Sequence, residues 1–104
     1  MTKLELAKRI GLHTTGYPRS ISKWAILNLI EDEYCVISEI FCGGIEVVVE
    51  QEDLVEGKLN ITKDDLVDER DIKSCCKQVV DLLWQRAADE YLARVHNAAM
   101  VIGG

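Results

Sequence analysis

Residues 34–50 read YCVISEIFCGGIEVVVE, and this stretch decides the fold that we expect. Two runs rich in β-branched residues flank Gly43-Gly44, and a glycine pair in that position is typical of a hairpin with a two-residue turn. Such a turn pairs Cys42 with Ile45. Because side chains alternate along a strand, one face of the hairpin would be largely apolar. The opposite face would display Ile37, Glu39, Phe41, Glu46, Val48 and Glu50.

The segments before the hairpin predict one helix and leave a second element open. Residues 2–5, TKLE, have the pattern of a capping box and predict a helix that ends at Gly11. The apolar run at 24–30 is compatible with a buried strand or with a helix. We favour a strand, because the acidic residues 31–33 would then turn into the hairpin. Ser20 or Ser22 as an N-cap keeps the helix alternative open.

The segment that follows the hairpin predicts further short elements. Residues 58–61 suit a short edge strand after a turn at Gly57. Residues 62–65, TKDD, form a second helix-start signature, with acidic residues near the positive end of the helix. This signature allows either a helix from this point or a single turn with a restart near Asp68.

A long C-terminal helix is indicated by the spacing of apolar residues. They recur every three or four positions from Ile72 to Ala99. An unbroken helix over 72–100 would be about 43 Å long. A nine-residue strand spans only about 30 Å, so we expect the helix to extend past the sheet.

These patterns together predict a single α+β domain over residues 1–104. It would have a short N-terminal helix, a small antiparallel β-meander of three or four strands, and a long C-terminal helix packed on the sheet. The apolar fraction of 48% and the charged fraction of 29% are ordinary for a globular domain. No secretory signal is visible, and no stretch approaches about 20 apolar residues, so we expect a cytoplasmic protein with no membrane contact.

Charge is unevenly distributed along the chain. The formal net charge is −6, but residues 31–71 carry a balance of −11, whereas residues 1–24 carry +4. A concentrated acidic segment argues against general binding of nucleic acid and suits docking to a basic protein surface.

The leading functional hypothesis is therefore a non-catalytic interaction protein and not an enzyme. Its acidic sheet face would occupy a basic surface on another protein. In general character, though not by a matched motif, it is similar to small acidic inhibitors encoded by phages and mobile elements. The residues expected to bind the partner are Glu39, Phe41, Glu46, Val48 and Glu50, with Glu52 and Asp53 at the rim.

A homodimer is the assembly that we expect. Small residues along the apolar stripe of the C-terminal helix permit close approach of a second helix, and the helix is expected to extend past its own sheet. The dimerisation residues would be Val80, Trp84, Ala88, Leu92 and Val95.

A DNA-binding regulator that uses residues 2–24 is the first alternative. Residues 6–12, LAKRIGL, resemble the first helix and turn of a DNA-binding helix-turn-helix, and residues 21–24, ISKW, resemble the end of a recognition helix. The stretch between them is about four residues longer than in that motif, and Pro18 would fall inside the recognition helix.

A cysteine-dependent enzyme is the second alternative. It would need a Cys–His contact formed in the tertiary structure, since no local signature of a nucleophilic cysteine surrounds any of the four cysteines. The cysteines also lack the paired spacing of structural zinc ligands. We therefore expect no metal and no cofactor, and we interpret the cysteines as small apolar residues.

Overall fold

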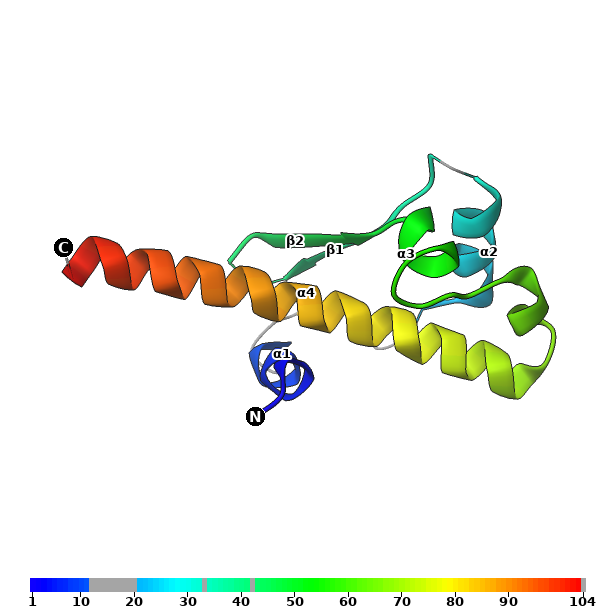
Figure 1. Cartoon of the computed structure of the whole chain (residues 1–104), viewed down its shortest axis with the longest axis horizontal. Helices are drawn as coiled ribbons and strands as arrows, with labels where there is room; N and C mark the ends of the chain where they lie inside the picture. The colour runs from blue at the N-terminus through cyan, green and yellow to red at the C-terminus, as the bar shows by residue number, and fades with distance from the viewer. Residues whose placement is uncertain (12–20, 33, 42, 104) are drawn as a thin grey trace.

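The computed structural model describes residues 1–11, 21–32, 34–41 and 43–103, and Figure 1 labels its main elements. The α+β class is confirmed, with the long C-terminal helix packed on the sheet. Within the described residues, however, the sheet has two strands and not three or four. The elements in chain order are α1 (Lys3–Gly11), α2 (Lys23–Glu31), β1 (Ile37–Phe41), β2 (Ile45–Val49), α3 (Gln51–Val55), the 3-10 helix η1 (Lys63–Leu66) and α4 (Glu69–Gly103).

Helix α4 forms the long axis of the molecule, which measures 53 Å against 25 and 23 Å in the other two directions. The hairpin lies along one side of α4, and α1 crosses the opposite side (Figure 1). Helices α2 and α3 and the η1 turn gather near the first turns of α4. The expected extension of the helix past the sheet is confirmed, because the C-terminal turns of α4 continue beyond the hairpin (Figure 1).

The N-terminal helix forms as its sequence predicts. The Thr2 hydroxyl accepts a hydrogen bond from the Glu5 amide at 3.1 Å, and the Glu5 carboxylate accepts one from the Thr2 amide at 3.2 Å. This reciprocal pair satisfies two amides that have no partner inside the helix. Ala7 is fully buried, and the Lys3 ammonium lies 2.9 Å from the Asp89 carboxylate of α4. The burial of Ala7 holds α1 against α4, and the exposed ion pair adds little to this contact.

The strand expected at 24–30 is wrong, because this run lies in α2. The Ser22 side chain accepts a hydrogen bond from the Ala25 amide at 3.2 Å and caps the helix. Ile26 and Leu29, three residues apart, then share a face and are fully buried. A continuous apolar run has no period of its own, so the cap and the burial of this face decide its structure.

The hairpin forms, but the expected register is wrong by one residue. Phe41 pairs with Ile45, so three residues and not two connect the strands, and Gly43 and Gly44 adopt positive φ angles of 80° and 74°. Strand β2 keeps its expected faces, whereas every side chain of β1 changes face. Cys42, which was expected to pair with Ile45, lies outside the described residues.

Packing against α4 explains this register. Phe41 is only 2% exposed, and its ring meets the Trp84 ring edge-on with centroids 5.9 Å apart. The observed register turns Ile37 and Phe41 inward, whereas the expected one would have turned Ser38 inward and Phe41 outward. Burying an aromatic ring gives more free energy than burying a hydroxyl side chain, which would lose its hydrogen bonds to water.

The edge strand expected at 58–61 is also wrong. This segment folds back on α3, where the Leu59 amide donates to the Asp53 carbonyl at 2.9 Å and the Ile61 amide donates to the Leu54 carbonyl. Asn60 has a positive φ of 49°, which turns the chain and places Ile61 in the core. The backbone amides of this segment therefore donate to carbonyls of α3 and not to those of a neighbouring strand.

Of the two alternatives at 62–68, the single turn with a restart is confirmed. The Thr62 amide donates to the Asp65 carboxylate at 2.9 Å, so the capping box starts only the η1 turn. Helix α4 begins at Glu69 and continues to Gly103. Its buried residues between 75 and 87 join both strands, α2, α3 and η1 in one core. No helix in the described ranges is both long and apolar enough to cross a membrane.

Candidate functional site

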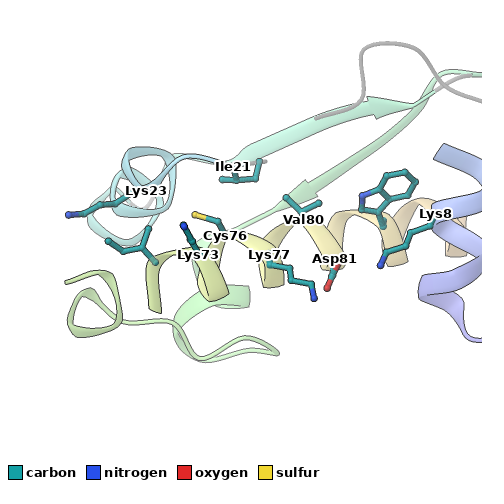
Figure 2. Close-up of a pocket in the computed structure, with 10 residues that line it drawn as sticks. Lys8, Ile21, Lys23, Lys73, Cys76, Lys77, Val80 and Asp81 are labelled. Carbon is teal, nitrogen blue, oxygen red and sulfur yellow. The ribbon is translucent and has the colours of Figure 1, made fainter. Parts of the chain in front are cut away.

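A groove along α4 has a volume of about 700 Å³. Its floor is a strip of α4 side chains at intervals of four residues, so that they lie on one helix face: Ile72, Cys76, Val80 and Trp84. Ile21, which precedes α2, adds to the apolar lining. Figure 2 shows the groove between α1 at one end and the start of α2 at the other.

Lysine side chains surround this apolar floor. Lys73 and Lys77 stand on α4 beside the floor strip, while Lys8 from α1 and Lys23 from α2 lie toward opposite ends (Figure 2). Asp81 is the only carboxylate among the described residues that line the groove. The local charge is therefore positive in a chain whose net charge is −6.

The lysines differ in how well their charges are compensated. The Lys73 ammonium lies 3.8 Å from the exposed Glu69 carboxylate, and the Lys23 ammonium lies 5.7 Å from the centre of the Trp24 ring. No carboxylate of the described residues lies within 4.0 Å of the Lys8 or Lys77 ammonium. An exposed ion pair contributes little, so most of the groove's positive charge is available to a ligand.

The outer face of the hairpin is the second candidate surface, and its residues differ from the expected set. Ile40 is 64% exposed and lies opposite Glu46 across the hairpin. Val36 is also exposed, and the Ser38 hydroxyl donates a hydrogen bond to the Glu46 carboxylate at 3.2 Å. Sequence reasoning missed Val36 and Ile40 because of the one-residue error in register. We define the outer hairpin face by Val36, Ser38, Ile40, Glu46, Val48 and Glu50.

Four of the seven residues expected to bind a partner are on or beside this face. Glu46 and Glu50 are exposed, Val48 is half-buried, and Glu52 is exposed on α3. Phe41 lies in the core, so the structure contradicts its expected exposure. Glu39 points to the inner side, where burial raises the pKa of its carboxyl group.

Asp53, which was expected at the rim of the partner-binding surface, has a structural partner within the chain. The Arg86 guanidinium donates to both Asp53 carboxylate oxygens, at 2.6 and 2.8 Å, and also to the Val48 carbonyl at 2.5 Å. The Asp53 carboxylate also accepts the Glu50 amide at 2.9 Å. The hydrogen bond from Arg86 lowers the pKa of Asp53, so the carboxylate stays charged. This pair joins α4 to β2 and α3.

The residues expected at a dimer interface divide into two groups. Val80 and Ala88 are buried within the chain, and Trp84 is half-buried beside Phe41. Val80 and Ala88 are therefore not exposed for contact with a second copy, and the dimer itself stays a prediction. Leu92 and Val95 remain exposed, at 42% and 47%, on the part of α4 beyond Asp89, where α1 is attached.

The N-terminal segment does not have the arrangement of a helix-turn-helix in its described residues. Helix α1 packs on the middle of α4, and α2 packs beside α3 and η1 near the start of α4 (Figure 1). In a helix-turn-helix the two helices pack directly against each other. The connecting residues 12–20, including Pro18, lie outside the described residues.

Cysteine chemistry receives no support from the surroundings of the described thiols. Burial raises the pKa of Cys76 in the groove floor, and burial with the nearby Asp65 charge raises that of Cys75. A reactive cysteine needs the opposite shift, because the thiolate is the nucleophile. Within the described residues, no group of three or more His, Cys, Asp or Glu side chains is placed to hold a metal ion.

Both candidate surfaces present apolar groups next to charges that are mainly of one sign, an arrangement found at protein interfaces. Comparison of the chain with protein-family models, with curated proteins and with solved structures found no match.

Proposed function

We propose that the chain is a non-catalytic interaction protein that docks the outer hairpin face on a basic surface of another protein. The observation that carries the proposal is the exposure of Ile40 beside the Glu46 carboxylate. A large aliphatic side chain in a water-exposed strand position is an unfavourable solvent contact that a partner would remove.

The two kinds of side chain on this face have different roles in the proposal. Ile40 and Val36 supply the apolar centre, where burial gives most of the binding free energy. Glu46 and Glu50 steer the encounter with a basic partner, and the association rate should therefore fall as salt concentration rises. The Ser38 hydrogen bond holds the Glu46 carboxylate in place before binding. If the basic surface has a function of its own, docking blocks it, and the chain acts as an inhibitor.

Photo-crosslinking tests the surface directly. The chain carries benzoylphenylalanine in place of Ile40, and a matched control carries it in place of Val67, which is 78% exposed and lies outside the hairpin. We expect the probe at position 40 to form a specific crosslink with a partner in native lysate, and the control to form none.

Charge reversal supplies the second arm of the test. In the substitution Glu46→Lys the net charge rises by two, as it does in the control Asp64→Lys on the exposed side of η1. Glu46→Lys should weaken capture of the crosslinked partner by roughly tenfold, whereas the control should not. Equal crosslinking from positions 40 and 67, or equal capture by the two charge variants, would refute the proposal.

A further inference from the structure

We infer that the lysine-rimmed groove along α4 is a docking site for one acidic amphipathic helix of a partner protein. The inference is independent of the proposed role of the hairpin, because the groove lies between α1 and α2 and shares no residue with the outer hairpin face.

The shape of the groove points to a helical occupant. From Ile72 to Trp84 the floor strip covers thirteen residues of α4, and the twelve steps between them give a length of about 18 Å. A helix of about three turns has this length. Its apolar side chains at positions i, i+3 or i+4 and i+7 would follow the four-residue spacing of the floor, the usual mode in which a helix binds a groove.

The floor is apolar but incompletely covered by the described residues. Val80 is 8% exposed, whereas Ile21, Ile72, Cys76 and Trp84 are half-buried at the edge of the core. Their exposed parts face the cavity, so a ligand gains free energy by removing them from water. Burial raises the pKa of the Cys76 thiol, which keeps this part of the floor neutral.

The positive charge of the groove favours a helix that carries acidic side chains. Among the described residues, four lysines and one aspartate line the groove, although the chain as a whole carries an excess of acids. Lysine side chains can lay their methylene groups on the apolar floor and direct their ammonium groups toward the rim. Glu or Asp side chains along the flank of a docked helix would meet Lys73 and Lys77, with Lys8 and Lys23 at its two ends.

The sequence that joins α1 to α2 has no acidic residue to match the lysine rim. Residues 12–20, which join α1 to α2, read LHTTGYPRS and contain no Asp or Glu. Charge complementarity therefore points to a separate molecule.

The test uses a designed peptide of fourteen residues with a Leu stripe at i, i+3, i+4, i+7 spacing and Glu at the flanking positions. A fluorescein label reports binding by anisotropy. A scrambled peptide of the same composition has the same charge without the stripe, and a third peptide has Lys in place of each Glu. We expect binding of the first peptide alone.

Two variants locate the binding site. The double substitution Lys73→Glu with Lys77→Glu should weaken binding roughly tenfold or more, since it reverses two charges at the rim. The control, Lys58→Glu with Lys63→Glu, changes the net charge equally at exposed positions outside the groove. Far-ultraviolet circular dichroism verifies that both variants are folded, and Glu46→Lys on the hairpin should leave peptide binding unchanged.

Trp84 provides a direct reporter of the groove floor. The chain contains two tryptophans, so Trp24→Phe leaves Trp84 as the only one, and its emission should shift to shorter wavelength when the peptide excludes water. The inference fails if the scrambled peptide binds equally or if both double variants lose binding equally. It also fails if single-stranded DNA or phosphatidylserine vesicles bind the groove more tightly than the peptide. A dimer in light scattering that dissociates in the Lys73→Glu, Lys77→Glu variant would assign the groove to a second copy and refute the inference.

Discussion

Replacing Arg86 with methionine is expected to lower the free energy of unfolding by about 2–3 kcal/mol at pH 7. The substitution removes two hydrogen bonds to the Asp53 carboxylate and one to the Val48 carbonyl. Breaking a fully buried pair costs about 3–5 kcal/mol. The side chains of Arg86 and Asp53 are 28% and 19% exposed, so water screens part of this loss.

The effect should depend on pH with a definite sign. Because Arg86 lowers the pKa of Asp53 in the folded chain, their interaction contributes its full stability at pH values above the unfolded-state pKa of about 3.9. That contribution is lost as the pH falls through the lower folded-state pKa. The difference in the free energy of unfolding between wild type and Arg86→Met should therefore have its maximum value at pH 7 and should decrease below about pH 4.

Urea denaturation followed by circular dichroism measures this difference at each pH. For a chain of this size, 2–3 kcal/mol corresponds to a midpoint shift of about 2 M urea. The control is Arg94→Met, which removes hydrogen bonds to the Gly43 and Gly44 carbonyls from a half-exposed guanidinium and should cost less than about 1 kcal/mol. Our account of the Arg86–Asp53 pair is wrong if Arg86→Met lowers the free energy of unfolding no more than Arg94→Met does. It is also wrong if the difference between wild type and Arg86→Met stays constant in acid.

Three further predictions test the other structural assignments. Glu39→Gln should stabilise the fold at pH 7 and have no effect in acid, as judged by thermal melts, because burial raises the pKa of Glu39 and penalises only its charged form. In urea denaturation, Phe41→Ala should lower the free energy of unfolding by about 3–5 kcal/mol, and Ile40→Ala should lower it by less than about 1 kcal/mol. If Ile40→Ala has the larger effect, the register with a two-residue turn is correct and the observed one is wrong. If the exposed end of α4 pairs with a second copy, Leu92→Glu with Val95→Glu should convert a dimer to a monomer in sedimentation equilibrium, whereas a monomeric wild type would exclude this dimer.

The parts of the fold that the sequence predicts well are those with a local chemical signature. The capping box at Thr2 and the helix-start signature at Thr62 each place their hydroxyl and carboxylate partners within one turn. The periodicity from Ile72 onward predicts α4 because it extends over many turns. These features need no knowledge of tertiary contacts.

The parts that fail depend on contacts between distant residues. The register of β1 is decided by the contact of Phe41 with Trp84, which lies 43 positions later in the chain. The run at 24–30 becomes a helix because its N-cap and its packing beside α3 and η1 both favour one. Residues 58–61 find backbone partners at the end of α3 and so form no strand.

The groove could be predicted only in part. Ile72, Cys76, Val80 and Trp84 belong to the apolar spacing that predicts the long helix, and Lys73 and Lys77 lie beside them in the sequence. The sequence contains no sign, however, that α1 and the start of α2 would bring Lys8 and Lys23 to opposite ends of this strip. That juxtaposition arises from the packing of both helices on α4.

The central position of α4 also has a consequence for biosynthesis. The hairpin, α1, α2 and η1 all pack on a helix that begins only at Glu69, so they emerge from the ribosome before their common support exists. A two-stranded hairpin alone is marginally stable in water. The nascent chain therefore exposes β-forming segments until α4 has been translated, and this is the interval in which chaperones would protect it.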